Sequence, residues 1–277
     1  MQKYTYPVVL TIAGSDSGGG AGIQADIKTI SALGCFATTA ITAVTVQNTL
    51  GVKAIHPVAI SFVTGQIRAV MDDMKPAVIK IGMVHSAELA AAIAAVLRDY
   101  PGIPVILDPV MVASSGDRLI SAGTVEVLKK ELFPLSTLVT PNLKEASILA
   151  DREINNPGEM KLAADELLKL GSLAVLVKGG HLTGPNLVDV YAHRDGYGKQ
   201  FPSLAIDTVN THGTGCSLSA AIAAHLAMGK DLELAIDRSI TYIQEAILQG
   251  ADVISGGGHG PLNHFFAPQK LIKLVRD

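Results

Sequence analysis

The sequence predicts an α/β fold, in which a mostly parallel central sheet has helices on both faces and a small antiparallel edge. Short runs rich in Val, Ile and Leu alternate with longer stretches of helical period, which is typical of strand–helix–strand crossovers. No repeat, charge block or linker rich in Pro and Ser interrupts this alternation. We therefore expect a single domain over residues 1–277.

Five apolar runs are typical of buried parallel strands, and they cover residues 8–13, 77–83, 104–110, 136–141 and 174–180. Two further strand-forming segments break the alternation. Residues 35–58 contain a turn at 48–51, and we expect them to cover part of a site beside the sheet. Residues 187–206 are expected to form an antiparallel hairpin at the edge of the sheet, around a turn at 194–198.

Helical period is found between the strands, in residues 23–33, 86–100 and 159–171. In the first of these segments, Ile23, Ile27 and Ile30 share one face. The second begins with Ser-x-Glu, a helix N-terminal signal, and the third ends on a glycine. These signals predict helices that pack an apolar face against the sheet.

The composition excludes several classes of protein. A hydrophobic content of 48%, a charged content of 17% and a formal net charge of -3 provide no basic surface for nucleic acid. The N-terminal residues lack the apolar region of a signal peptide, and the longest apolar stretch, 89–97, is less than half a membrane span. The two cysteines, Cys35 and Cys216, form no CxxC pair. We expect a cytoplasmic protein with no membrane or nucleic-acid partner.

A glycine-rich turn, GSDSGGGAG at 14–22, follows the first strand and precedes the first helix. This is where an open α/β sheet offers backbone N–H groups to a ligand. Gly20, Gly22 and Ala25 fit the loose GxGxxG/A pattern of dinucleotide sites, but no acidic residue for the ribose occurs from 27 to 71. The pattern thus disfavours a dinucleotide, and a turn without a ligand remains an alternative.

A second glycine turn, HGTGC at 212–216, begins another predicted helix. The first N–H groups of a helix have no intrahelical partners, so this turn is suited to stabilising an oxyanion. The same helix dipole is expected to lower the pKa of Cys216, which makes the thiol a candidate base or nucleophile. The alternative is a cysteine that serves as a small buried apolar side chain.

Three polar residues follow the ends of predicted strands. Asn142 and Glu145 lie three residues apart on one face of a helical turn, where they are suited to holding hydrated Mg²⁺. Alternatively, Asn142 is a helix N-cap with Glu145 as its partner. Lys178 is placed to meet phosphate oxygens or is simply solvated. No GxxxxGK[ST] motif is present, which disfavours a P-loop enzyme.

Seven motifs together resemble the hydroxymethylpyrimidine/phosphomethylpyrimidine kinases of thiamine biosynthesis, members of the ribokinase-like superfamily. In chain order they read TIAGSDSGGGAGIQAD, AVTVQNT, KIGM, LDPVM, TPNLKEA, VLVKGGH and NTHGTGC. The resemblance covers nearly the whole chain. It implies a ribokinase-like fold and the use of ATP and Mg²⁺ to phosphorylate 4-amino-5-hydroxymethyl-2-methylpyrimidine and its monophosphate. We also expect a homodimer.

The resemblance also implies roles for individual residues. Gln47 matches the glutamine that reads the pyrimidine, and an amide offers both a donor and an acceptor to such a ring. The other positions that match the substrate pocket are Gly14, Asp26, Met83 and Val110. Among these, Asp26 is expected to hydrogen-bond the substrate, while Met83 and Val110 contact its ring.

For the chemistry, the resemblance places Cys216 where many relatives carry an aspartate base. Cys216 is expected to deprotonate or position the hydroxymethyl group, while the backbone amides from Gly213 through Gly215 to Cys216 hold the transferred phosphoryl. Residues expected to bind the nucleotide are Lys178, Thr211, Thr214 and Asn142, with Glu145 beside Mg²⁺. Asp108 is left between a metal role and a structural one.

The end of the chain departs from the family pattern. The segment SGGGHGPLNHFF at 255–266 is similar to the family's C-terminal glycine-rich segment but differs in spacing, which puts the adenine side in doubt. Since His181, His212, His259 and His264 show no HxxxH or HExxH spacing, we interpret them as loop or capping residues.

Two alternatives stay open. One is a pyridoxine, pyridoxal or pyridoxamine kinase, because relatives of this family phosphorylate those hydroxymethyl pyridines too; Gln47 favours the aminopyrimidine. The other is a non-catalytic pyrimidine-binding relative, which the combination of Lys178, Glu145 and the HGTGC turn disfavours, since a pure binder needs no anion site.

Overall fold

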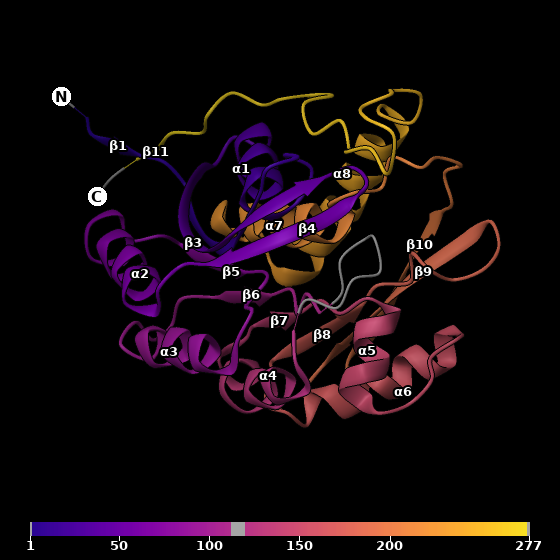
Figure 1. Ribbon diagram of the computed structural model, residues 1–277, viewed down its shortest axis with the longest axis horizontal. Helices are drawn as coiled ribbons and strands as arrows, with labels where there is room; N and C mark the ends of the chain where they lie inside the picture. Colours follow the sequence, from indigo (N-terminus) through magenta and orange to yellow (C-terminus); the bar gives the residue numbers. More distant parts are fainter. Residues whose placement is uncertain (1, 112–119, 276–277) are drawn as a thin grey trace.

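In residues 2–111 and 120–275, which the computed structural model describes, nine strands form one central sheet (Figure 1). The strands are β2 (Val8–Asp16), β3 (Phe36–Asn48), β4 (Gly51–Pro57), β5 (Val78–Ile81), β6 (Val105–Leu107), β7 (Leu138–Val139), β8 (Ala174–Val177), β9 (Asn186–His193) and β10 (Gly198–Leu204). Their order across the sheet is β10-β9-β8-β7-β6-β5-β2-β3-β4. The pairs from β3 through β8 are parallel.

Antiparallel strands lie at both edges of this sheet. As predicted, residues 187–206 form the hairpin β9–β10, and β9 pairs antiparallel with β8. Residues 35–58 form β3 and β4, and β4 pairs antiparallel with β3 at the opposite edge. The predicted fold class is confirmed, with a second antiparallel edge in addition to the expected one.

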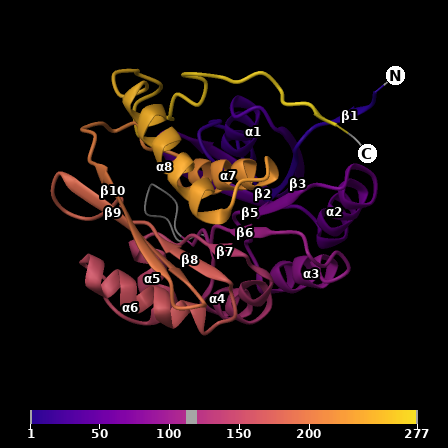
Figure 2. The same ribbon diagram turned by 180° about the vertical axis from the view of Figure 1, so that it is seen from behind.

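Helices cover both faces of the sheet, as Figures 1 and 2 show. One face carries α2 (Ile60–Met74), α3 (Ala87–Leu97), α4 (Ala122–Val127), α5 (Leu143–Ala150) and α6 (Pro157–Leu168); the other carries α1 (Gly22–Ala32), α7 (Thr214–Ala227) and α8 (Leu232–Leu248). Short turns of π-helix (Leu128–Leu132) and 3₁₀-helix (Phe133–Leu135) follow α4. No helix within the described ranges is long and apolar enough to span a membrane.

Side chains of each strand alternate between two hydrophobic clusters. In β2, Leu10 and Ile12 join the cluster under α2 to α6, whereas Val9 joins the cluster under α1, α7 and α8. The same alternation runs through β5 to β8, so the central strands are buried on both faces. This burial accounts for the nearly continuous apolar runs in the sequence.

The buried face of α1 differs from the prediction. Ile23 and Ile30 are buried as expected, but Ile27 is 38% exposed, and Asp26 takes the inward position. The reason is an ion pair across the core, because Lys80 of β5 reaches Asp26 beneath the helix. The spacing of apolar residues does not predict a charged residue on the inner face of a helix.

Two short strands near the chain ends form a separate antiparallel pair. β1 (Tyr4–Thr5) pairs with β11 (Leu274–Val275), so the two ends of the described chain lie side by side (Figure 1). The parallel strands end at one common edge of the central sheet. Strand β2 is followed in sequence by β3 on one side, and the later strands extend from its other side, which makes its carboxyl end a switch point where ligands bind in open α/β sheets.

Candidate functional site

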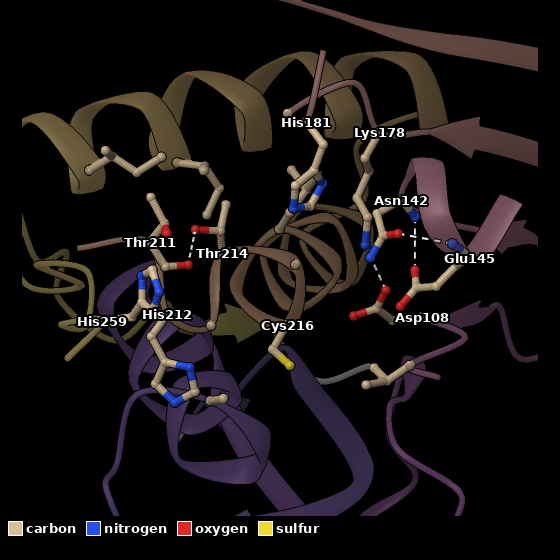
Figure 3. A pocket seen from close by; sticks show the side chains of 18 of the residues that line it. Asp108, Asn142, Glu145, Lys178, His181, Thr211, His212, Thr214, Cys216 and His259 are labelled. Carbon is tan, nitrogen blue, oxygen red and sulfur yellow. Dashed lines mark hydrogen bonds and ion pairs between the residues drawn. The ribbon is translucent and has the colours of Figure 1, made fainter. Parts of the chain in front are cut away.

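A cavity of about 590 Å³ lies at the carboxyl ends of the parallel strands. It collects side chains and turns that are far apart in sequence (Figure 3). The predicted site residues that line it are Gly14, Gln47, Met83, Val110, Asn142, Glu145, Lys178, Thr211, Gly213, Thr214, Gly215 and Cys216. The structure thus brings together every predicted site residue except Asp26, while their roles stay predictions.

Asp26 lies below the cavity and does not line it. It is fully buried, and its two carboxylate oxygens accept hydrogen bonds from the Lys80 ammonium at 3.0 and 2.8 Å. Burial lowers the pKa of Lys80, but the Asp26 carboxylate more than offsets this and holds the pKa above its usual range. The expected place of Asp26 in the cavity lining is therefore corrected, because Lys80 holds its carboxylate, while the expected hydrogen bond to a substrate stays a prediction.

The two glycine-rich turns meet at the cavity. Gly213 is the N-cap of α7 and has a φ of 84°, a conformation that favours glycine. A Cβ atom at this position would overlap the backbone carbonyl of Gly20 in the first turn. Glycine at 213 is required both for the turn of the chain and for this close approach, which places the N-terminus of α7 against the first turn.

Cys216 lies in the first turn of α7 and points toward the cavity (Figure 3). The backbone amide of Gly22 donates a hydrogen bond to its sulfur. Burial raises the pKa of the thiol to about 11, although Lys80 acts in the opposite direction. The expected lowering of the pKa is wrong, because loss of hydration outweighs the helix N-terminus, and the thiol is protonated at neutral pH.

A cluster of charged groups forms the opposite wall. The Lys178 ammonium donates to Asp108 at 2.8 Å, and the hydroxyl of Thr140 donates to the same carboxylate at 3.3 Å. Burial lowers the pKa of Lys178, but Asp108 and then Glu145 outweigh it, so the pKa lies above its ordinary value and the side chain keeps its charge. Asp108 therefore holds Lys178 at the end of β8, facing the cavity.

Asn142 and Glu145 form a capping box at the start of α5. The Asn142 side chain accepts from the Glu145 amide at 3.0 Å, and Glu145 accepts from the Asn142 amide at 2.8 Å. The capping interpretation of Asn142 is thus confirmed, and both residues also line the cavity. Burial raises the pKa of Glu145 to about 7, with Lys178 opposing and Asp108 adding to the rise.

This cluster supplies few direct ligands for a metal. In the described part of the chain, no group of three or more His, Cys, Asp or Glu side chains is arranged to hold an ion. Glu145 and Asp108 nevertheless present two carboxylates at neighbouring strand ends. Such a pair fits Mg²⁺, which keeps several waters and binds proteins through one or two carboxylates.

Sequence reasoning missed two parts of the site. One is the pair formed by His212 and Asp16, whose Nε2 and Oδ2 atoms lie 2.9 Å apart. The only sequence signal for this pair was Asp16 itself, a polar residue inside the first glycine-rich turn. The other is an apolar wall on α8, where Ile240, Ile243 and Ile247 line the cavity. Their spacing is that of any amphipathic helix, so no signal separated them from core residues.

Comparisons with known proteins show the family and the fold. The sequence model of the family described as phosphomethylpyrimidine kinase matches residues 16–263. The ADP complex of Bacillus subtilis pyridoxal kinase superposes with a TM-score of 0.86 at 32% sequence identity, covering 94% of this chain and 98% of that one. The fold is therefore shared with a pyridoxal kinase as well.

Curated relatives are closer in sequence. The hydroxymethylpyrimidine/phosphomethylpyrimidine kinase of Rhizobium meliloti is 47% identical over 259 residues, which are 93% of this chain and 97% of that protein. The thiamine biosynthesis bifunctional protein ThiED of Geobacter sulfurreducens is 48% identical over 269 residues, which are 97% of this chain but 54% of that protein, so the chain spans about half of the bifunctional relative. With the family model matched over most of its length, the chain belongs to the phosphomethylpyrimidine kinase family.

Proposed function

We propose that this chain transfers phosphate from ATP to 4-amino-5-hydroxymethyl-2-methylpyrimidine, and then to the monophosphate, in thiamine biosynthesis. The observation that carries this proposal is that Gln47 and the turn from Gly213 to Cys216 border the same cavity. One feature suits an aminopyrimidine ring and the other suits a phosphoryl group. The family and its Rhizobium meliloti relative support the same activity.

The ring site is formed by the first half of the sheet. Gln47 at the end of β3 offers donor and acceptor atoms to the ring edge, while Met83 and Val110, beyond the ends of β5 and β6, provide apolar contact. Gly14 leaves room for the Met83 side chain, because a Cβ atom there would lie 2.6 Å from the Met83 methyl carbon. Replacing Gly14 would therefore reshape this pocket.

The phosphoryl site is formed by the second half. The N-terminus of α7 offers backbone amides to the transferred group, and the Lys178 ammonium offers a fixed positive charge. Thr211 and Thr214 line the cavity beside the N-terminus of α7, and we place the nucleotide phosphates along them. Mg²⁺, held through water by Glu145 and Asp108, would neutralise the charge of those phosphates.

The high pKa of Cys216 gives this residue a positioning role. A protonated thiol can donate to or accept from the substrate hydroxyl, so Cys216 orients the hydroxymethyl oxygen toward the phosphate. Phosphoryl transfer depends mainly on such positioning and on charge neutralisation. The adenine ring is assigned to the apolar wall of α8, where Ile240, Ile243 and Ile247 line the cavity.

The test is a coupled assay of ADP formation with three acceptors in turn: the hydroxymethylpyrimidine, its monophosphate and pyridoxine. We expect ADP formation with the first two and much slower formation with the third. ADP formation with pyridoxine alone would overturn the proposal, and the absence of ADP formation with any acceptor would favour a non-catalytic binder.

A pyridoxal-type kinase is the second candidate, because the likeness to the Bacillus subtilis pyridoxal kinase extends over the whole fold. Gln47 discriminates between the two. Its replacement by alanine should raise the KM for the aminopyrimidine while leaving slow pyridoxine turnover nearly unchanged. An equal loss with both acceptors would favour the second candidate.

We also propose that the chain acts as a homodimer through the outer face of the β3–β4 hairpin. Val44 and Val46 alternate along β3 with residues that face the cavity, and they are 47% and 57% exposed; Leu50 in the turn is 68% exposed. A second copy would bury this apolar face. Sedimentation equilibrium should give a dimer, and the double variant V44K/V46K should give a monomer. A monomeric wild-type chain would exclude this assembly.

Because the proposed reaction consumes ATP, we further propose that the protein acts in the cytoplasm. The free thiols of Cys35 and Cys216 fit that compartment. Cell fractionation followed by immunodetection would test the assignment, and recovery outside the cytoplasmic fraction would contradict it.

A further inference from the structure

A chain of hydrogen-bonding groups runs along one side of the cavity and passes through Gln47. Asp16 Oδ2 lies 2.9 Å from His212 Nε2, which lies 3.4 Å from Gln47 Nε2. Gln47 Oε1 lies 3.1 Å from the Thr45 hydroxyl, and that hydroxyl lies 2.9 Å from the carbonyl oxygen of Ser15, so two acceptor oxygens face its single proton. The acceptors at the two ends of this hydrogen-bonded series, Asp16 and the Ser15 carbonyl, decide where each proton lies.

At the first end, Asp16 can only accept. Its carboxylate already accepts hydrogen bonds from the backbone amides of Gly18, Gly20 and Ala21. Burial pushes the pKa of Asp16 upward, but the hydrogen bonds from His212, Ala21 and Gly18 outweigh it, so the pKa lies below its ordinary value and the group is ionised.

Because an ionised carboxylate has no proton to give, the nitrogen of His212 that faces it must carry one. Nε2 of His212 is therefore a donor, whether the ring is neutral or charged. The ring is also held in place sterically, since it packs so closely against Gly20 that a Cβ atom there would overlap the ring. His212 thus presents a fixed N–H to Asp16 and to the neighbouring amide.

At the other end, the Thr45 hydroxyl has one proton and two oxygens within reach. The carbonyl of Ser15 accepts only, and it is the nearer partner, so the proton points to it. The hydroxyl oxygen then has lone pairs left for the amide of Gln47. A donor is needed on that side, and the only donor that an amide offers is its nitrogen.

The oxygen and nitrogen ends of an amide have the same shape, so hydrogen-bond partners decide their places. We infer that Asp16, His212 and Thr45 orient the Gln47 amide with its nitrogen toward Thr45 and its oxygen toward His212, so that the two ends are exchanged relative to the contacts given above. This orientation sets which way round the substrate ring binds. The inference rests on the proposed aminopyrimidine substrate.

The consequence for the substrate follows from its chemistry. One amide proton and one oxygen lone pair remain for the ring, whose nitrogen accepts and whose 4-amino group donates. The amino group must then lie on the His212 side, and the 5-hydroxymethyl group on the adjacent ring carbon lies farther along that same side. A reversed amide would turn the ring over and place the hydroxymethyl group at the Thr45 end. His212, Thr45 and Asp16 are therefore positioning residues that determine productive binding.

The kinetic test removes the hydroxyl that anchors the amide nitrogen. Thr45→Val keeps the shape of the side chain, and we expect a KM for the aminopyrimidine about tenfold higher, with a lower kcat because the ring also binds reversed. The KM for ATP should not change. Thr45→Ser restores the hydroxyl and should rescue both parameters.

The matched control is Thr38→Val. Thr38 lies on the same strand, is 7% exposed against 6% for Thr45, and donates to the Val9 carbonyl of β2 just as Thr45 donates to Ser15 of β2. It does not line the cavity. If Thr45→Val behaves like Thr38→Val, or if Thr45→Ser fails to rescue, the inference is overturned.

A second measurement needs no substrate. In protein labelled with ¹⁵N-histidine, the His212 signals can be assigned by their loss in His212→Gln, and we expect Nε2 to be protonated. A His212 ring with a bare Nε2 would overturn the inference. If the wild-type enzyme fails to phosphorylate the aminopyrimidine, the proposed function fails, whereas the proton position at His212 still decides the orientation of the amide.

Discussion

Two opposing effects act on the pKa of the Cys216 thiol. It lies at the N-terminus of α7, where the helix dipole favours a thiolate, yet burial beside the sheet raises its pKa to about 11. A base with so high a pKa is protonated at neutral pH and cannot take up the hydroxyl proton. We therefore propose that the residue contributes through contact and orientation at the acceptor oxygen.

This role predicts the behaviour of Cys216→Ala. The variant should bind the pyrimidine with near-normal affinity by titration calorimetry, and kcat should fall by roughly 10² or more, because the acceptor hydroxyl is no longer oriented. Unchanged turnover would remove the cysteine from the mechanism, and lost binding would indicate a misfolded pocket.

The buried ion pair between Asp26 and Lys80 predicts an effect on the stability of the folded protein. Because both groups are fully buried, Asp26→Leu alone leaves an uncompensated ammonium, and we expect a loss of about 3 to 5 kcal/mol in the free energy of unfolding. The double variant Asp26→Leu/Lys80→Met should recover most of this loss. Urea unfolding of the two single variants and the double variant measures the coupling. Additive losses would show that the two charges do not support each other.

Glu145 predicts a pH dependence of stability. Its pKa in the folded state is about 7, above the ordinary value of 4.5, because the carboxyl is buried. The folded state holds a proton that the unfolded chain gives up, so the stability gained is complete below pH 4.5 and is lost as the pH rises through 7.

Glu145→Gln cannot ionise and keeps an oxygen for the Asn142 amide. We expect its urea midpoint, relative to wild type, to be higher at about pH 8 than at about pH 5, while kinase activity falls. The same difference at both values would mean that Glu145 does not titrate in this range.

The sequence predicted individual residues unevenly. Lys178 was predicted at the cavity because it follows a strand end, and the carboxyl ends of parallel strands share one edge. Gln47, near the end of β3, was predicted there from the motif it shares with the family. Asp26 was misplaced because a motif match does not tell which way a helical side chain turns. The direction of the Cys216 pKa was wrong because burial depends on tertiary packing, which local spacing does not contain.

At the scale of elements, the two glycine turns form one unit. The turn at 14–22 and the turn at 212–216 lie far apart in the sequence, yet they pack so closely that a Cβ atom on Gly213 would overlap the carbonyl oxygen of Gly20. The sequence of each turn was enough to predict a resemblance to an anion-binding loop. It could not predict the contact between the two turns, because that contact depends on the packing of α1 against α7.

This contact predicts the effect of Gly213→Ala. The substitution adds the strain of a positive φ, roughly 1 to 2 kcal/mol, and also pushes the two turns apart, so kcat should fall sharply. Gly229→Ala is the matched control, since Gly229 follows the same helix with a φ of 80° and has no atom within 4 Å of the added carbon. Equal kinetics and equal urea midpoints for the two variants would contradict a role for the contact.

The order of the elements was predicted better than their limits. The apolar run at 104–110 forms a strand of only three residues, Val105–Leu107, because Asp108 and Val110 beyond it line the cavity. The helices α2 and α8 were not predicted at all. No capping side chain marks the start of α2. Asp231 caps the start of α8 and Gly250 follows its end, so the signals for α8 were present in the sequence.

At the scale of the whole molecule, one sheet joins both hydrophobic clusters. Every central strand contributes alternate side chains to each cluster, so neither can lose its packing without disturbing the strands that hold the other. The sheet also carries the cavity at its carboxyl edge, with the proposed ring site on β3, β2 and β5 and the proposed phosphoryl site on β8 and α7.

We therefore propose that the chain unfolds as a single domain. Urea unfolding followed by far-UV circular dichroism, which reports helices, and by near-UV circular dichroism of the tyrosines should give coincident midpoints, and calorimetric and van't Hoff enthalpies should agree. Two separated transitions would indicate that the halves of the sheet are independent units.

The pairing of Tyr4 with Val275 has a consequence for engineering. Because the ends of the described chain are neighbours, a short peptide could join them, and new ends could be opened in the exposed turn of the β9–β10 hairpin. Such a circularly permuted chain would keep the register of all nine central strands, so the catalytic groups would be assembled from the same fold in a different order of synthesis.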